Sequence, residues 1–148
     1  MCPKRLDRKP QILGLALAFA GLIYVSSPAA GGEKPYQVVD GKVDFGTYNG
    51  YRRYHNRCHA CHGFGGVGSS FGPSLIDSLK RIDKDEFYSV VVAGRITDIG
   101  GGARNVMPSF AGDPNVMEHM VDIYAYVKAR SDGVIGPGRP PHLPKKKE

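Results

Sequence analysis

The chain has 148 residues, a formal net charge of +6 and only three cysteines. This length is enough for one domain with an ordinary hydrophobic core. The positive charge forms no basic stripe on a predicted helix and does not alternate with aromatic residues, which excludes a nucleic-acid-binding protein.

The first thirty residues have the composition of a cleavable signal peptide. Basic residues come first, and residues 12–25 form an apolar run that is too short for a comfortable membrane span. Small residues follow, so we expect cleavage after Ala29 or Ala30, with an uncleaved membrane anchor as the alternative. Residues 1–30 therefore predict export to the periplasm, without stable membrane insertion once the signal is removed.

Residues 31–43 are a polar lead-in, and the domain itself is expected over residues 44–131. Its first helix is predicted over residues 44–60, because Phe45, Tyr48 and His55 fall near one stripe. Gly50 lies inside this helix at some energetic cost, and an interior glycine usually marks the close approach of another backbone.

The end of this helix carries the sequence Cys-His-Ala-Cys-His, in which Cys58, Cys61 and His62 have the spacing of a c-type haem attachment site. One helical turn brings both sulfurs to the same haem edge, where they can form thioethers to the two vinyl groups. His62 then supplies one axial nitrogen to the iron. Two other interpretations are weaker, because half a zinc site lacks a second cysteine pair and a thioredoxin-like pair lacks a preceding strand pattern.

The segment after His62 is rich in glycine over residues 63–72 and continues into Pro73. It lacks the Gly-Lys-Ser/Thr ending of a phosphate-binding loop, so we expect its backbone to pass close to the haem, where side chains do not fit. Because the loop returns beneath the ring, the Pro73 carbonyl is the expected acceptor for the second nitrogen of His62, which fixes its tautomer.

The rest of the domain is predicted to consist of helices joined by loops. A short helix is expected over residues 75–80, a second from Asp83 to Gly94, and a last one over residues 115–130. Residues 95–112 are predicted as a glycine-rich loop. The Pro/Lys-rich residues 132–148 are predicted as a flexible tail. The predicted fold class is therefore all-α.

Met107 is the expected second axial ligand of the iron. It lies on the predicted loop and precedes Pro108, which would stiffen that loop over the distal face; the alternative is that Met107 fills the core. The other candidates lie on the motif's own helix, on the last helix or in the tail: His55, His59, Met117, His119, Met120 and His142. Iron held by imidazole and thioether has no vacant position and a raised reduction potential, which favours a one-electron carrier over an enzyme. Weaker candidates, for contacts with haem propionates, are Tyr48, Tyr51, Tyr54 and Arg95.

These residues together resemble the class I c-type cytochromes. The likeness spans about residues 44–130 and combines the haem motif with Gly50 and Tyr54 before it, Gly72-Pro73-Ser74-Leu75 after it, and the Met107-Pro108 pair. It implies one covalent haem c in the core of a small domain whose N- and C-terminal helices cross. Ile123 and Tyr126 are expected to face that crossing.

A narrower resemblance, to exported cytochromes similar to cytochrome c-L, rests on residues 38–54, 113–117 and 126–133. Those cytochromes accept electrons from dehydrogenases of methanol and other alcohols that use pyrroloquinoline quinone (PQQ). The resemblance implies a quinoprotein alcohol dehydrogenase as electron donor, and another cytochrome or a terminal oxidase as acceptor. The alternatives are a haem sensor or peroxidase-like enzyme with a labile Met107, and a cytochrome subunit of a larger oxidoreductase.

Overall fold

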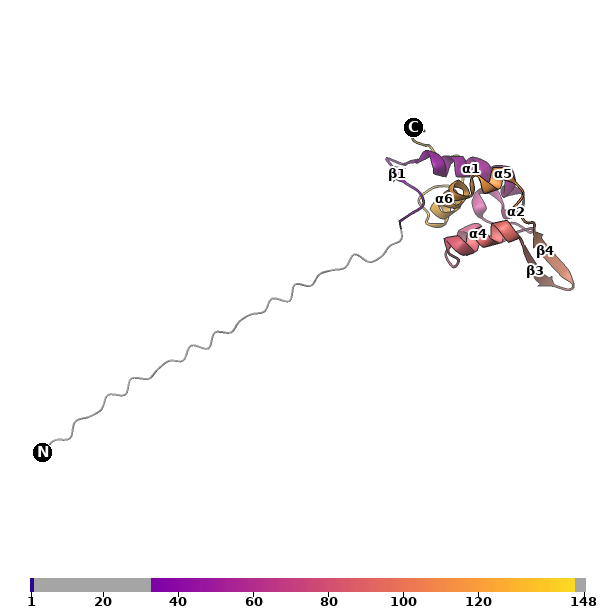
Figure 1. Cartoon of the computed structure of the whole chain (residues 1–148), viewed down its shortest axis with the longest axis horizontal. Coiled ribbons are helices and arrows are strands. Elements are labelled where there is room, and N and C mark those ends of the chain that lie inside the picture. Colours follow the sequence, from indigo (N-terminus) through magenta and orange to yellow (C-terminus); the bar gives the residue numbers. More distant parts are fainter. Residues whose placement is uncertain (2–32, 146–148) are drawn as a thin grey trace. The chain divides into compact units, whose positions relative to one another are not determined.

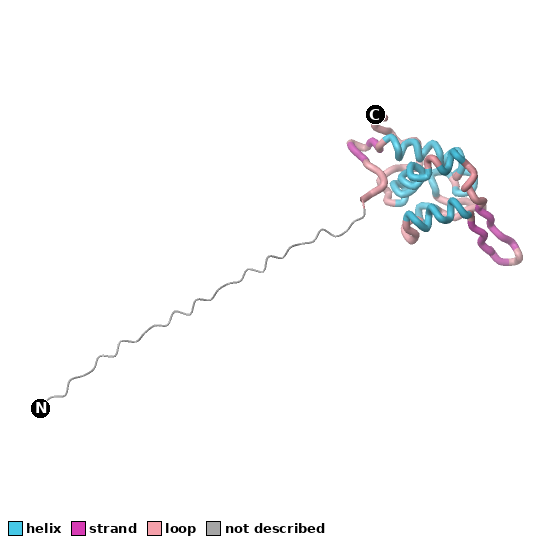
Figure 2. Tube along the Cα trace, viewed as in Figure 1, coloured by secondary structure: helices cyan, strands magenta, loops and turns pink. Residues whose placement is uncertain are grey.

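The computed structural model describes Met1 and residues 33–145, and the latter form a mostly helical unit (Figure 1 and Figure 2). The predicted signal peptide, apart from Met1, lies outside the described residues. In the part of the chain that the structure describes, no helix is both long and apolar enough to cross a bilayer.

Helix α1 (Phe45–Arg57) begins at Asp44, whose side chain caps it by accepting a hydrogen bond from the Thr47 amide at 2.9 Å. The helix ends earlier than predicted, because the backbone interrupts it at Cys58. Helix α2 (His59–His62) follows as a separate turn. The interruption gives the haem motif a turn of its own at the end of α1.

Helix α1 crosses α6 (Met120–Ser131), and this pair of helices is in the most extensive contact. At the crossing, a Cβ on Gly50 would overlap the Asp122 carbonyl of α6. The predicted close approach at Gly50 is therefore confirmed, and its partner is the last helix. The two residues expected at this crossing, Ile123 and Tyr126, are both buried.

The last predicted helix is divided in two. Helix α5 (Pro114–Met117) starts at Asp113, whose side chain accepts a hydrogen bond from the Asn115 amide at 2.9 Å. Helix α6 starts afresh at Met120 because His119 leaves the helical conformation. Neither glycine nor proline marks this break, so hydrophobic spacing alone predicted one continuous helix. The break leaves Met117 exposed on α5 while Met120 is buried on α6.

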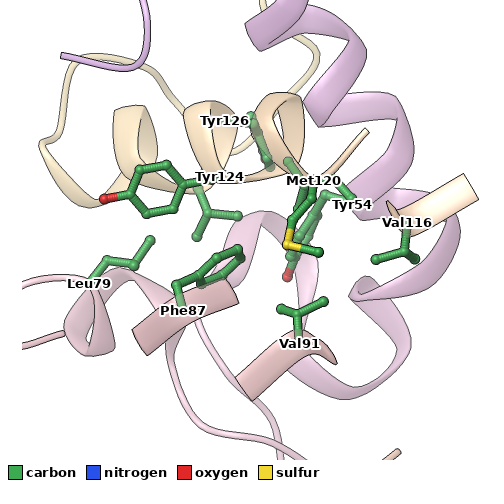
Figure 3. Close-up of a cluster of buried hydrophobic side chains, with 10 residues drawn as sticks. Tyr54, Leu79, Phe87, Val91, Val116, Met120, Tyr124 and Tyr126 are labelled. Atoms are coloured by element: carbon green, nitrogen blue, oxygen red, sulfur yellow. The ribbon is translucent and has the colours of Figure 1, made fainter. Parts of the chain in front are cut away.

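The hydrophobic core lies where α6 meets α4 (Lys84–Ala93). Figure 3 shows Phe87 and Val91 of α4 pointing toward Tyr124 and Met120 of α6. The rings of Phe87 and Tyr124 have centroids 5.3 Å apart. Since Phe87 and Val91 are one helical turn apart, the predicted apolar face of α4 is the face that packs on the core.

The boundaries of α4 agree with the prediction. The Asp83 side chain accepts a hydrogen bond from the Glu86 amide at 2.8 Å, and Gly94 ends the helix with a positive φ of 77°. The short helix expected before it is α3 (Leu75–Ser78). Local capping chemistry therefore located this part of the fold correctly.

The long loop predicted over residues 95–112 is wrong over most of its length. Strands β3 (Arg95–Gly100) and β4 (Ala103–Met107) form an antiparallel hairpin in which Arg95 is paired with Met107. The hairpin projects away from the helices (Figure 1). Every residue of β3 is exposed, so no burial imposes the hydrophobic alternation by which strands are recognised.

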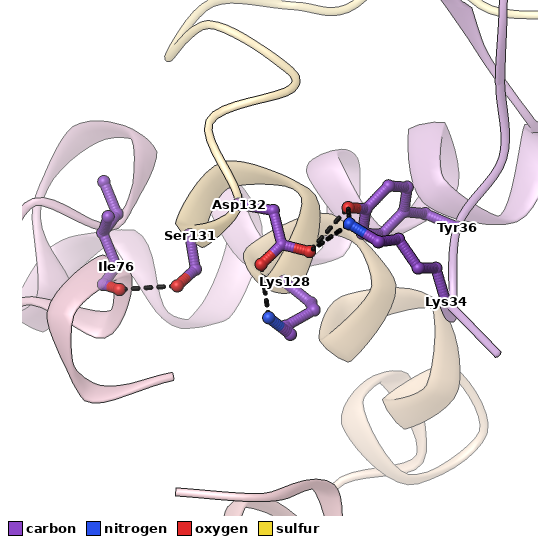
Figure 4. A network of polar contacts seen from close by, with 6 residues as sticks. All are labelled: Lys34, Tyr36, Ile76, Lys128, Ser131 and Asp132. Carbon is purple, nitrogen blue, oxygen red and sulfur yellow. Dashed lines mark hydrogen bonds and ion pairs between the residues drawn. The ribbon is translucent and has the colours of Figure 1, made fainter. Parts of the chain in front are cut away.

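The lead-in before α1 forms two short strands, β1 (Val38–Val39) and β2 (Lys42–Val43), and is tied to the end of α6. Figure 4 shows the connection, in which the Tyr36 hydroxyl donates a hydrogen bond to Asp132 at 2.6 Å. Asp132 also pairs with Lys128, one turn earlier on α6. The lead-in is thus part of the folded unit.

The chain beyond α6 was expected to be a flexible tail over residues 132–148, but part of it makes defined contacts. Val43 donates its amide to the Pro141 carbonyl at 3.0 Å, and its carbonyl accepts a hydrogen bond from the Leu143 amide at 2.8 Å. His142 stacks on Tyr48 with ring centroids 3.8 Å apart. Because this proline-rich segment bonds to β2 rather than to itself, its local sequence could not reveal the contact.

Candidate haem site

A cavity of about 510 Å³ lies between α4, the hairpin and the haem motif. This volume is in the range of about 300–1,000 Å³ typical of cofactor sites. The apolar part of its wall consists of Phe71, Pro73, Leu75, Ile82, Phe87, Val90, Val91, Val106, Pro108, Phe110, Val116 and Ile123. Such a wall suits a large, flat and mostly apolar group.

The three residues of the haem motif all line this cavity. The amides of Cys61 and His62 both donate to the Cys58 carbonyl, at 3.2 and 2.9 Å, so a single turn carries the motif. Burial raises the pKa of the Cys58 thiol to about 12, with a further contribution from Cys61. A thioredoxin-like pair follows a β-strand, whereas this motif follows helix α1, so the structure argues against the redox interpretation.

His62 is buried, with 7% of its surface exposed, and its ring is held from one side. Its Nδ1 lies 2.9 Å from the Pro73 carbonyl, which is the contact expected from the sequence. A carbonyl only accepts, so Nδ1 is the donor and Nε2 carries the lone pair of the neutral ring. Burial lowers the pKa of His62, although the bond to Pro73 opposes this effect. A neutral imidazole with its lone pair on Nε2 is the form that binds a metal.

The glycine-rich loop after the motif folds back against His62. The Gly68 amide donates to the His62 carbonyl at 2.7 Å, and the short 3-10 turn η1 (Phe64–Gly66) lies between them. The buried Tyr54 hydroxyl donates to the Gly63 carbonyl at 2.6 Å. These bonds fix the loop against α1, so that Gly72 and Pro73 reach the cavity wall.

Two thioethers reach the cavity, those of Met107 and Met120. Met107 ends β4, whereas Met120 lies at the start of α6 and belongs to the buried core (Figure 3). None of the other candidates for the second axial position lines the cavity: His55, His59, Met117, His119 and His142. The structure therefore reduces the choice to Met107 and Met120, of which the sequence favoured Met107.

Three arginines also line the cavity, Arg57, Arg81 and Arg95. Arg57 pairs with Asp113 at 3.0 Å and Arg95 with Glu86 at 3.2 Å. Guanidinium groups on a mostly apolar wall suit the carboxylates of haem propionates.

Only Arg95 of these three was expected from the sequence. Tyr48, Tyr51 and Tyr54, the other candidates for propionate contacts, do not line the cavity. Tyr54 instead uses its hydroxyl on the glycine-rich loop. The position of Arg57 directly before Cys58 was an available signal, whereas Arg81 reaches the wall only through the tertiary fold.

The donor set fits a c-type haem and not a zinc ion. Within residues 33–145, no three side chains of the His, Cys, Asp and Glu types lie close enough to hold a metal ion between them. The wall does provide two cysteine sulfurs, one oriented imidazole and two thioethers around one apolar space. These groups are what covalent attachment and axial ligation of haem require.

Comparisons with known proteins agree with this geometry. The family model described as cytochrome c oxidase, cbb3-type, subunit III matches residues 47–127, more than half of the chain. Cytochrome c-555 of Methylococcus capsulatus is 39% identical over 132 residues, which cover 88% of this chain and 93% of that protein.

Cytochrome c-553I of Paracoccus denitrificans is 39% identical over 106 residues, which cover 71% of this chain and 46% of that protein. This chain therefore spans about half the length of that relative. The crystal structure of the c-type cytochrome XoxG from Methylobacterium extorquens AM1 is similar with a TM-score of 0.63 and 37% identity. The match covers 79% of this chain and 76% of that one.

Proposed function

Because this chain belongs to the class I monohaem c-type cytochromes, electron carriers with covalent haem c, we propose which of its residues hold the haem. Cys58 and Cys61 form the thioethers, and His62 and Met107 are the two axial ligands. The observation that carries this assignment is that one cavity wall includes all three side chains of the attachment motif together with Met107.

The haem supplies one-electron redox chemistry, and the surrounding residues restrict the protein to that chemistry. With both His62 and Met107 binding the iron, no coordination position would remain for a substrate. The neutral Met107 thioether favours the reduced state and raises the reduction potential. Pro73 holds the His62 ring in the orientation and tautomer that ligation needs. The apolar wall excludes water, which also favours the state of lower charge.

The proposed electron donor is a quinoprotein alcohol dehydrogenase, and the proposed acceptor is a second cytochrome or a terminal oxidase. The resemblance of residues 38–54, 113–117 and 126–133 to cytochromes similar to cytochrome c-L supports this donor. A location in the periplasm follows from the signal peptide expected at residues 1–30. Docking must be brief for turnover, so we expect a small interface whose association rate falls with salt.

Substitution of the two methionines at the cavity tests the axial assignment. We expect Met107→Leu to abolish the weak red absorption band of ferric iron bound to methionine, to lower the reduction potential, and to let carbon monoxide bind the ferrous protein. Met120→Leu is the matched control, since it removes the other thioether that the described residues place at the cavity, and it should retain the band. A Met107→Leu variant with an unchanged band and potential would refute the assignment.

Reduction by a purified PQQ-dependent alcohol dehydrogenase tests the proposed donor. The ferric protein should be reduced rapidly in the presence of the alcohol, more slowly as salt is raised, and not at all without the alcohol. Failure of such dehydrogenases to reduce it would refute the donor while leaving the axial ligands untouched. Fast binding of carbon monoxide to the unmodified protein would instead favour the sensor or peroxidase-like alternative.

A further inference from the structure

The segment that carries Met107 is fastened to the end of helix α4. The hairpin leaves α4 at Arg95 and returns at Met107, and these two residues are paired across the strands. The chain then continues through Pro108 and Ser109 directly beside the last turn of α4. Met107 is therefore at the base of the hairpin, where the two strands meet the helix.

Gly94 makes the closest contact at this base. Its φ is +77°, and a Cβ built on it would lie 2.6 Å from the Met107 carbonyl oxygen, 2.9 Å from the Ser109 nitrogen and 3.0 Å from the Pro108 carbonyl carbon. Real Cβ atoms essentially never lie less than 3.0 Å from such atoms, and the first two of these distances are below that limit. Any larger residue at position 94 therefore requires α4 and the backbone of residues 107–109 to move apart.

Ser109 and Phe110 bind the carbonyls that the end of α4 leaves without helical partners. The Ser109 hydroxyl donates to the Val92 carbonyl at 2.5 Å, and the Phe110 amide donates to the Val91 carbonyl at 3.0 Å. Helix ends need such partners for their last carbonyls. The same bonds that complete α4 thus fix the chain immediately after Met107.

The hairpin tip contrasts with this base. Gly100, Gly101 and Gly102 all have positive φ, and a Cβ on any of them would meet no atom within 4 Å. The tip can therefore move without disturbing packing, whereas the fastening at Gly94 and Ser109 lies at the opposite end of the hairpin, next to Met107.

We propose that Gly94 and Ser109 are positioning residues that keep the Met107 sulfur on the haem iron, so that the protein acts as a closed electron carrier. This inference rests on the proposed function, in which Met107 is an axial ligand. Neither residue touches the haem in this account. Each acts through the backbone of residues 107–109, and loosening it converts Met107 into a labile ligand.

Substitutions in the holoprotein separate positioning from simple stability. Ser109→Ala removes one hydroxyl from an exposed residue, so the fold should persist. Ser109→Thr keeps the hydroxyl and is the rescue variant. Gly94→Ala introduces the clash, and Gly112→Ala is its matched control, because Gly112 has open space and no positive φ. The readouts are the red band, the reduction potential and the rate of carbon monoxide binding to the ferrous protein.

Ser109→Ala loses the hydrogen bond to the Val92 carbonyl and the weaker one from the Ala111 amide at 3.3 Å. We expect it to bind carbon monoxide about five- to tenfold faster, with a weaker red band and a lower potential. Gly94→Ala should show a larger change of the same kind, while Ser109→Thr and Gly112→Ala should match the unmodified protein. If Gly94→Ala fails to fold, the two Ser109 variants still decide the matter.

The inference would be overturned if Ser109→Ala kept the red absorption band, the reduction potential and the carbon monoxide binding rate of the unmodified protein, even if its melting temperature fell. Comparison with Met107→Leu distinguishes this failure from that of the proposed function. If Met107→Leu loses the band while the position 94 and 109 variants keep it, Met107 is the ligand and only the fastening is wrong. If Met107→Leu also keeps the band, the axial assignment itself fails.

Discussion

The crossing of α1 and α6 and the β3–β4 hairpin are built by opposite means. At the crossing, Gly50 allows two backbones to touch, and the side chains around it, such as Tyr54 and Tyr126, are fully buried. On the hairpin, Ile96 and Ile99 are 63% and 56% exposed, and three glycines at the tip have open space around them. The crossing therefore depends on the missing side chain at Gly50, which leaves room for the other backbone, whereas the hairpin depends on hydrogen bonds between its two strands.

The candidate haem cavity lies between these two regions, and each region supplies one of the two proposed axial residues. His62 follows the end of α1 and is held by the packed side of the molecule, through Pro73 and the glycine-rich loop. Met107 ends the exposed hairpin; its side chain is half-buried against the edge of the core, and its backbone is fastened at the hairpin base. The backbone around His62 is therefore held by the packed loop, whereas the backbone around Met107 is held by the contacts at the hairpin base.

Gly50→Ala is expected to have the largest effect on stability, because the new methyl would overlap the Asp122 carbonyl. Alanine in place of glycine would otherwise favour the helix by up to about 1 kcal/mol. We expect the clash to exceed that gain and to lower the free energy of unfolding by about 3 kcal/mol. Denaturant unfolding, with Gly112→Ala as the open-space control, measures it; a stabilised Gly50→Ala variant would contradict the close crossing.

Tyr54→Phe tests the link between the crossing and the haem loop. Removal of the hydroxyl breaks its hydrogen bond to the Gly63 carbonyl, which keeps the Gly66 amide as a donor at 3.2 Å, so we expect a loss of about 1 kcal/mol in unfolding free energy. Tyr126→Phe is a suitable control, because the Tyr126 hydroxyl is equally buried and has no hydrogen-bond partner among the described residues. Equal effects of the two substitutions would show that the Tyr54 hydroxyl contributes nothing specific.

Asp132→Asn tests the fastening of the lead-in to α6, with a defined dependence on pH. Burial tends to raise the pKa of Asp132, but hydrogen bonds from Lys128, Tyr36 and Lys34 outweigh it and lower the pKa from 3.8 to about 2. Because this pKa is lowered on folding, ionised Asp132 stabilises the fold at pH values above the ordinary pKa of 3.8, and this stabilisation is lost as the pH falls from about 4 to 2.

The expected loss in Asp132→Asn is about 1 kcal/mol at pH 7, since partial exposure screens the charges, and it should disappear near pH 2. Asp40→Asn, at an exposed turn, is the control for the removal of one carboxylate charge. Chemical denaturation at a series of pH values gives the difference directly. A constant difference between Asp132→Asn and the unmodified protein across that range would show that the charge is irrelevant.

Ile99→Ser on the hairpin should have the smallest effect. The side chain is mostly exposed, so its replacement should change the unfolding free energy by less than about 0.5 kcal/mol. The red absorption band should also be unchanged, because the base of the hairpin is untouched. A large fall in unfolding free energy or a loss of the red band would mean that the hairpin tip contributes to the packed part of the molecule, which would remove the contrast between the two regions.

Short-range chemistry was readable from the chain itself. The spacing of Cys58, Cys61 and His62 within one helical turn was enough to predict a haem attachment site. The cap of α4 by Asp83 needs only the Glu86 amide, three residues away. The glycine at position 50 also predicted a close approach, because an interior glycine costs helix stability unless another backbone requires the space. Such features depend on neighbours within a few residues, so the order of the residues is sufficient to predict them.

Long-range placement was not readable in this way. Residues 95–107 were predicted as loop but form a hairpin in which Arg95 pairs with Met107. Because β3 is exposed, its sequence has no alternation of apolar and polar residues that would predict a strand. Arg81 and Met120 reach the cavity only because α3, α4 and α6 pack around one space. Packing of distant segments depends on the shape of the whole core, and periodicity along one segment contains no information about which face another segment will cover.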